Sequence, residues 1–326
     1  MKILKIAGCG GIDPITFKNH LIYKLLERVS NCEIKFTSIF KADIIFIGPY
    51  YNFFNIISNK ILKRFLSQDY YIPSISVFFN DFFYKNKKFK KIFLSAENYL
   101  NYEKIKADYY LTCFLSSQQN HFRVPYWKGC ADWPEYDIYF DNTVSGNGLR
   151  YGASLDIKRM MEPLGNDFMK RGKSFCLFTS HMDYPRNEIY RVFKKDFVVD
   201  GYGYYFDKKI QNHNKSNFKK KDILKSYSFN LCPENNCLPG VTGQNVCDAF
   251  IAGSLAVTWT HRYIDYEYNN KAFINLIDYQ NENFKEIIKL LKDDTFLKNF
   301  VNEPLLKNKP NLDKEILFVK ELLNSL

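Results

Sequence analysis

Short apolar runs alternate with segments of helical apolar spacing along most of the chain. Residues 1–7 and 42–47 have the continuous apolar character of buried strands, and residues 15–29 between them have apolar positions spaced as on one face of a helix. Strand, helix and strand in this order predict the opening of a doubly wound parallel sheet. Further predicted strands of this series are residues 74–78, 91–94 and 109–113. We therefore expect a Rossmann-like domain over residues 1–145.

A second alternating series follows residues 143–150, which contain two glycines and are the best candidate for a linker. Its predicted strands are residues 173–180, 196–200, 229–232, 255–259 and 272–277, and its predicted helices are residues 283–292 and 312–326. The predicted fold class is α/β, with two Rossmann-like domains that face each other across a cleft. The expected domains are residues 1–145, residues 146–311 and a C-terminal helix, 312–326, that packs back towards the first domain. One face of this helix is predicted to consist of Leu312, Ile316, Val319, Leu323 and Leu326.

The stretch from 228 to 259 predicts a strand, a loop, a helix and another strand. The first strand ends at Glu234 and Asn235, a Pro-Gly turn leads into the helix, and Gly253 ends that helix before the next apolar run. The loop between Glu234 and Gln244 is therefore expected at the carboxyl end of a strand, facing the first turn of a helix. Free backbone N–H groups and the positive end of the helix dipole collect there, which makes this loop a candidate diphosphate site.

Composition adds size and charge to this picture. The chain has 326 residues, 46% of them hydrophobic, which is enough for two α/β cores, and no apolar run reaches the roughly 18 residues of a membrane-spanning helix. The first residues have a charge followed by only a few apolar side chains, unlike a signal peptide, so we expect a cytoplasmic protein.

The net charge of +11 includes the basic runs 85–91 and 219–221. Such runs usually form solvated faces. The alternative is a peripheral contact with an anionic membrane surface or with phosphorylated carriers. No nucleic-acid-binding motif accompanies the charge, so nucleic acid is not an expected partner.

Metal and thiol chemistry have little support. The eight cysteines have no paired spacing of the zinc or redox kind, and the five histidines are widely separated. Most of the cysteines are expected to be small buried residues in a reducing compartment. We therefore predict no metal site.

Several motifs occur in an order that is typical of one known family. These motifs are Phe-Asn-Leu-Cys-Pro-Glu-Asn at 229–235, the residues 241–246, Asp-Ala-Phe at 248–250, Ala-Val-Thr-Trp at 256–259 and Ala-Phe-Ile-Asn-Leu-Ile-Asp at 272–278. Together they resemble the signature of the α1,3/α1,4-fucosyltransferase family, which is glycosyltransferase family ten.

The resemblance implies an inverting glycosyltransferase of the GT-B architecture that requires no metal or other cofactor. Its co-substrate would be a GDP-sugar, first of all GDP-fucose, and it would transfer L-fucose to an acceptor hydroxyl. The acceptor would be an oligosaccharide or glycolipid of a bacterial surface glycan, such as lipopolysaccharide or capsule, built at the inner face of the membrane. The first domain would face this acceptor, and the second would bind the nucleotide sugar.

Two upstream segments resemble further parts of the family pattern. Ser-Ala-Glu-Asn at 95–98 implies that Glu97 is the catalytic general base, because a carboxylate within hydrogen-bond reach can take the proton of the acceptor hydroxyl. Pro-Arg-Asn at 185–187 implies that Arg186 binds the diphosphate, since paired guanidinium donors match phosphate oxygens. Without the resemblance, both side chains would be interpreted as surface residues.

The donor-binding residues implied in the second domain are Arg186, Glu234, Asn235, Val241, Thr242, Gln244 and Asn245. Among them, Glu234 is expected to order the loop by accepting backbone N–H bonds. The family signature has Tyr-Val-Thr-Glu-Lys where this chain has Val-Thr-Gly-Gln-Asn at 241–245. The loss of the lysine removes a positive charge from the diphosphate site, and the loss of the glutamate removes a strong acceptor for sugar hydroxyls.

Three explanations of this departure stay open. The donor could be another GDP-sugar, such as a heptose or deoxy sugar. Another cation, such as Arg262, Lys225 or Arg191, could supply the missing charge. The protein could also be a catalytically inactive, glycan-binding relative. We favour a working transferase with altered donor recognition.

Overall fold

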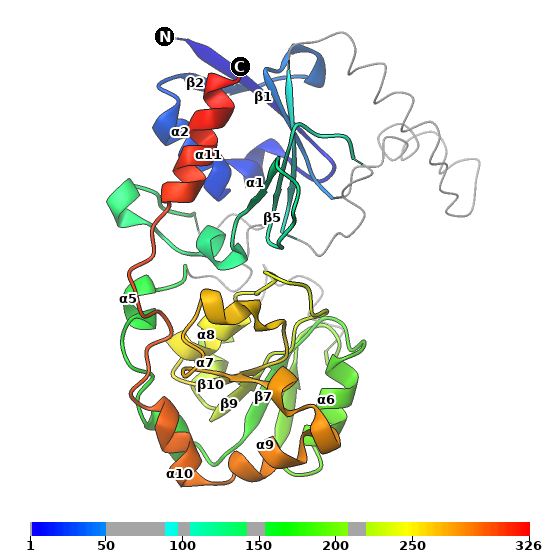
Figure 1. Ribbon diagram of the computed structural model, residues 1–326, viewed down its shortest axis with the longest axis vertical. Helices are drawn as coiled ribbons and strands as arrows, with labels where there is room; N and C mark the ends of the chain where they lie inside the picture. The colour runs from blue at the N-terminus through cyan, green and yellow to red at the C-terminus, as the bar shows by residue number, and fades with distance from the viewer. Residues whose placement is uncertain (1, 50–88, 97–104, 142–153, 208–219) are drawn as a thin grey trace, which may run out of the picture. The chain divides into compact units, whose positions relative to one another are not determined.

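The computed structural model describes residues 2–49, 89–96, 105–141, 154–207 and 220–326, and these form two compact α/β units (Figure 1). The first unit comprises Met1–Thr112, Ser116–Val124 and Asp313–Leu326. The second comprises Cys113–Leu115 and Pro125–Leu312. The predicted strand at 74–78 and the predicted linker at 143–150 lie outside the described residues.

The first unit is built on a six-stranded parallel sheet with the strand order β2-β1-β3-β4-β5-β6. Its strands are β1 (Ile3–Cys9), β2 (Glu33–Phe36), β3 (Ile44–Ile47), β4 (Lys90–Ser95), β5 (Tyr109–Thr112) and β6 (His121–Arg123). All four residues of β3 are buried, as expected for a strand inside a parallel sheet that is covered on both faces. The predicted opening strand–helix–strand unit is therefore confirmed, although the single helix predicted over 15–29 is two helices that are separated at residues 19–20. The strands β2 and β6 were not predicted.

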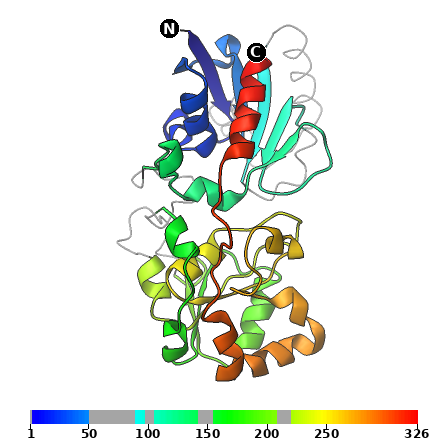
Figure 2. The same cartoon turned by 60° about the vertical axis from the view of Figure 1, so that its left-hand side comes forward.

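Helices α1 (Pro14–Lys18), α2 (Leu21–Val29) and α11 (Asp313–Asn324) belong to the first unit, and α11 lies beside α2 in both views (Figures 1 and 2). On α11, Phe318 packs against Tyr109 of β5 and Phe122 of β6. The predicted apolar face of this helix is wrong in part. Its buried residues are Glu315, Phe318, Val319 and Leu322, whereas Ile316 and Leu323 are only half-buried and Leu326 is exposed. The buried stripe is displaced because Phe318, the largest apolar side chain of the helix, faces the sheet.

The second unit has a five-stranded parallel sheet with the order β11-β10-β9-β7-β8. Its strands are β7 (Phe175–Phe178), β8 (Val199–Tyr202), β9 (Phe229–Leu231), β10 (Leu255–Thr258) and β11 (Ile274–Asn275). Its helices are α5 (Ile157–Met160), α6 (Arg186–Phe193), α7 (Lys220–Leu224), α8 (Asn245–Ile251), α9 (Lys285–Leu290) and α10 (Asp294–Leu297). Phe175 stacks on Phe229 across the middle of the sheet, with ring centroids 4.6 Å apart, so an aromatic core supports the strands that carry the loop after β9.

The start of α2 makes the stability of the first unit sensitive to acid. The Nδ1 atom of His20 accepts the N–H of Ile22 at 3.2 Å, and its ring stacks on Phe17. This cap requires a neutral imidazole, and burial lowers the pKa of His20 to about 4. Because the folded pKa lies below the unfolded value of about 6.5, the stabilisation is complete above pH 6.5 and is lost as the pH falls towards 4.

The variant His20→Asn keeps a capping acceptor but does not titrate. We therefore expect its unfolding free energy to fall less steeply than that of the wild type as the pH is lowered. Between pH 7 and pH 4.5 the wild type should lose about 2 kcal/mol more unfolding free energy than the variant. Urea unfolding of both proteins across this range measures the difference. Parallel curves would show that His20 is not the titrating cap.

Candidate functional site

The loop 233–245, counted to include Asn245 at the start of helix α8, joins the central strand β9 to that helix. The sequence predicted this loop between Glu234 and Gln244. The N–H of Glu234 donates to the carbonyl of Trp259 at 3.0 Å, which holds the start of the loop beside the end of β10. At the far end, the buried residues of α8 are Val246, Cys247, Ala249 and Phe250. The helix stops before Gly253, whose φ of +69° is a left-handed angle that glycine adopts at little cost in free energy. The predicted strand, loop, helix and strand are therefore confirmed, with the loop at the carboxyl end of β9.

Glu234 ties the two ends of this loop together. Its side chain is buried, at 9% exposure, and its Oε1 atom accepts the N–H of Gly243 at 2.7 Å. A Cβ atom on residue 243 would lie 2.6 Å from that oxygen, so the contact needs a glycine there. Burial raises the pKa of Glu234, while the Gly243 N–H and the charges of Arg186 and Lys220 oppose this shift. The expectation that Glu234 accepts a backbone N–H bond within the loop is confirmed for the N–H of Gly243.

Arg186 is the first residue of α6 and lies against the start of the loop. Its Nε atom donates to the carbonyl of Pro233 at 3.0 Å, and its Nη1 atom donates to Thr179 Oγ1, just after β7, at 3.3 Å. The side chain is half-buried. Arg186 therefore lies at the carboxyl ends of β7 and β9, beside the loop that was predicted from the sequence as a candidate diphosphate site.

A second cation, Lys220, lies at the other end of the loop. Its Nζ atom donates to Asn245 Oδ1 and to Asp248 Oδ2, each at 2.7 Å, and lies 5.5 Å from the centre of the Phe178 ring. The residue is 1% exposed. The sequence interpretation of the run 219–221 as a solvated face is wrong for Lys220, because α7 turns this side chain inwards onto the acidic residue of α8.

The remaining donor-binding candidates of the second unit differ in exposure. Asn235 is exposed, Val241 is buried, and buried Thr242 donates from Oγ1 to Glu267 at 2.9 Å. Gln244 is buried as well: its Oε1 atom accepts the thiol of Cys130 at 3.1 Å, and its Nε2 atom donates to Asp248 Oδ2 at 3.3 Å. Gln244 and Asn245 thus bond to side chains inside the unit.

The three cations considered from the sequence lie elsewhere. Arg262 pairs with Asp278 at 2.9 Å, Lys225 faces Asp222 at 3.8 Å, and the side chains of both cations are exposed. Arg191 is an exposed residue of α6. The candidate base Glu97 lies outside the described residues, as does Asn98 beside it.

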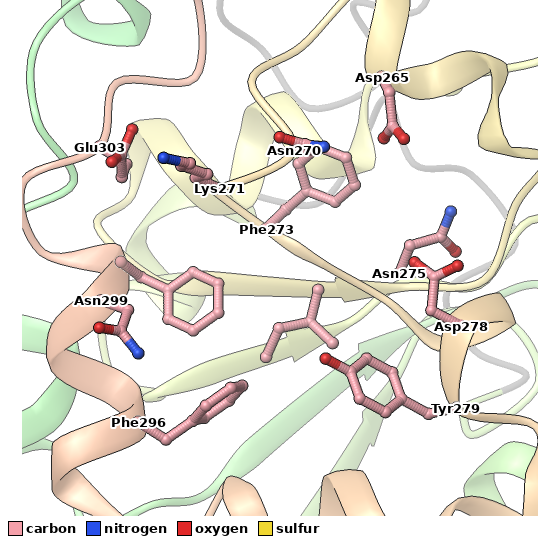
Figure 3. Close-up of a pocket in the computed structure, with 12 residues that line it drawn as sticks. Asp265, Asn270, Lys271, Phe273, Asn275, Asp278, Tyr279, Phe296, Asn299 and Glu303 are labelled. Atoms are coloured by element: carbon pink, nitrogen blue, oxygen red, sulfur yellow. The ribbon is translucent and has the colours of Figure 1, made fainter.

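A pocket of about 440 Å³ lies at the β11 edge of the sheet (Figure 3). Phe273, Phe296 and Tyr279 line it together with Asp265 and Asp278. Burial and the neighbouring Asp278 raise the pKa of Asp265. None of the donor-binding candidates of the second unit lines this pocket, so it is not the predicted diphosphate site.

The cysteines match their predicted role, since none of the eight forms a disulfide and six are buried. Burial raises the pKa of Cys232 to about 12, as it does for Cys247, which makes these thiols poor nucleophiles. Within the described ranges, no group of three or more His, Cys, Asp or Glu residues is arranged to hold a metal ion. In the same part of the chain, no helix has both the length and the apolar composition needed to cross a membrane.

Two α/β units, each with a parallel sheet, define a GT-B type of fold, and solved structures share it. The chain matches a crystal structure of an α1,3-fucosyltransferase with a TM-score of 0.61 and 20% identity, covering 99% of this chain and 90% of that one. A structure described as α1,3-fucosyltransferase with GDP-fucose matches equally well, with a TM-score of 0.61, 20% identity and coverage of 99% and 91%. The predicted α/β fold class with two Rossmann-like domains is therefore confirmed.

Sequence comparison finds two relatives that are described as fucosyltransferases. The chain is 28% identical over 159 residues to an α-(1,3)-fucosyltransferase of Helicobacter pylori, covering 48% of this chain and 32% of that protein. It is 26% identical over 160 residues to a putative fucosyltransferase of Acanthamoeba polyphaga mimivirus, covering 45% and 27%. The matched stretch thus spans less than a third of the length of each of these curated relatives, and no protein-family model matches the chain. The resemblance to the α1,3/α1,4-fucosyltransferases is confirmed.

Proposed function

We propose that the chain is a glycosyltransferase that moves a sugar from a GDP-sugar, in the first instance L-fucose from GDP-fucose, to a hydroxyl of a glycan acceptor. The relatives named above support the reaction class. The observation that carries the proposal is the placement of Arg186, whose guanidinium is fixed at the carboxyl edge of the sheet beside the loop 233–245. Open α/β sheets bind their ligands at this edge.

The proposed reaction is a single displacement. The acceptor oxygen forms a bond to the anomeric carbon while the bond from that carbon to the phosphate oxygen breaks, and GDP leaves with the electron pair. Attack from the face opposite the leaving group inverts the configuration. Negative charge grows on the diphosphate as the bond breaks, and Arg186 is placed to stabilise it in the role that a metal ion has in other transferases.

The proton of the acceptor hydroxyl needs a base, and we propose Glu97 for this role on the resemblance alone. The acceptor that we propose is a bacterial surface glycan assembled at the inner face of the membrane. The net charge of +11 supports a peripheral contact with anionic lipids during this step.

A different GDP-sugar is the second candidate, and the buried Gln244 favours it. Both polar ends of this amide are bonded to neighbours inside the unit, at Cys130 and Asp248. This position has an amide where the family signature has a carboxylate, and the amide is already bonded within the unit. The recognition of the donor sugar would therefore differ from that of the family.

The test is a donor screen with the purified full chain. We expect GDP to be released, with transfer to a glycan acceptor, from GDP-fucose or another GDP-sugar, and the rate to be unchanged by EDTA. Mass spectrometry of the products and of the released nucleotide identifies the donor. Use of UDP-sugars, or tight binding of UDP, would contradict the proposal. Transfer from no donor would favour the glycan-binding alternative.

A further inference from the structure

The ammonium group of Lys220 is enclosed by the protein rather than by water. It donates to Asn245 and Asp248, which both belong to the start of α8, and the ring of Phe178 lies on another side. Moving a charged group out of water costs several kcal/mol, and the attraction within a buried ion pair often fails to offset this cost, so a buried pair is weak evidence for a gain in stability. The arrangement therefore needs an explanation other than stability.

The two cations flank the loop 233–245. Arg186 contacts its first residue, Pro233, and Lys220 contacts its last residue, Asn245. Burial raises the pKa of the Glu234 carboxyl, and the charges of both cations oppose this shift. Two cations and two carboxylates, Glu234 and Asp248, thus form one cluster around the loop. Its formal charges balance when both carboxylates are ionised.

We propose that Lys220 is a positioning residue for the donor. Its ammonium group supplies the second positive charge beside the diphosphate and holds Asn245 at the start of α8. It provides from α7 the charge that position 245 lacks in this chain. Without Lys220 the cluster would carry a net negative charge and would repel a diphosphate, which has two to three negative charges near neutral pH. The inference rests on the proposed function.

The main test is the affinity of the full chain for GDP, measured by isothermal titration calorimetry. We expect Lys220→Met to weaken GDP binding about tenfold, because one close charge is removed. Lys221→Met is the matched control, since Lys221 is the exposed next residue of the same helix, and it should leave the affinity unchanged. The double variant Lys220→Met/Asn245→Lys moves the ammonium to position 245, and it should recover most of the affinity.

A comparison of ligands separates an effect of charge from a loss of structure. Lys220→Met should weaken GDP but leave the affinity for guanosine, measured by NMR titration, within about twofold, because guanosine carries no phosphate. Equal losses for both ligands would overturn the proposed role of the charge. The dependence of GDP binding on salt should also be shallower in the variant than in the wild type.

The outcomes distinguish this inference from the proposed function. If the wild type does not bind GDP, the proposed function fails and this inference fails with it. If the wild type binds GDP and Lys220→Met binds it equally well, only the inference fails. If Lys220→Met does not fold, the double variant decides: GDP binding within about threefold of the wild type supports the inference, and loss of binding overturns it.

Discussion

Arg186→Lys is expected to lower kcat/KM for the nucleotide-sugar donor about 100-fold, and Arg186→Ala about 1,000-fold. The guanidinium bonds Pro233 and Thr179 through two different nitrogens, and only a planar group with several donors can hold both contacts and also face a phosphate. A lysine keeps the charge but loses this fixed geometry. Initial rates of GDP release and calorimetric affinities for GDP measure the effect.

Arg191→Lys is the matched control, because Arg191 is an exposed residue of the same helix and should tolerate the change. Thermal unfolding should be similar for the wild type and both conservative variants. An Arg186→Lys protein that keeps more than about a third of the wild-type kcat/KM would show that the diphosphate does not bind at this guanidinium.

Gly243→Ala is the second change with a large expected effect. The new Cβ would lie 2.6 Å from Glu234 Oε1, and that carboxyl cannot move aside without losing the Gly243 N–H at 2.7 Å. A buried carboxylate without its hydrogen-bond donor destabilises the folded state, so we expect a loss of about 1–2 kcal/mol in unfolding free energy. Displacement of the loop should also weaken GDP binding about tenfold.

Gly129→Ala is the control for this glycine, since a Cβ there has no neighbour within 4 Å. It should leave both the unfolding free energy in urea and the GDP affinity close to the wild type. A second variant, Gly243→Ala/Glu234→Ala, removes the close contact and should be no less stable than Glu234→Ala alone. If the Gly243→Ala protein matched Gly129→Ala in both unfolding free energy and GDP affinity, the result would argue against this loop as the donor site.

Much of the fold follows from local apolar patterns, and the misses have identifiable causes. Strands such as β3 and β10 are buried throughout and almost entirely apolar because both faces are covered, so their runs are evident in the sequence. The strand β2 has the mixed sequence Glu-Ile-Lys-Phe and lies at the sheet edge, where one exposed side removes the apolar signal. The strand β6 is a three-residue edge strand, too short for any pattern.

The candidate site was predictable only where its parts are close in sequence. Glu234 and Gly243 belong to one loop, and the turn residues between them indicate its course. Lys220 could not be predicted, since its partner Asp248 is 28 residues away and basic runs are normally solvated. Only the packing of α7 on α8 separates this lysine from its exposed neighbour Lys221.

Helix α11 has a consequence for the order of folding during synthesis. It packs beside α2 and covers Tyr109 and Phe122, yet in the sequence it follows the whole of the second unit. Domains generally fold as they emerge from the ribosome, N-terminal parts first. In this chain, the part of the first unit that α11 covers keeps its apolar surface exposed until the second unit has been translated. Helix α11 then completes the unit whose sheet was translated first.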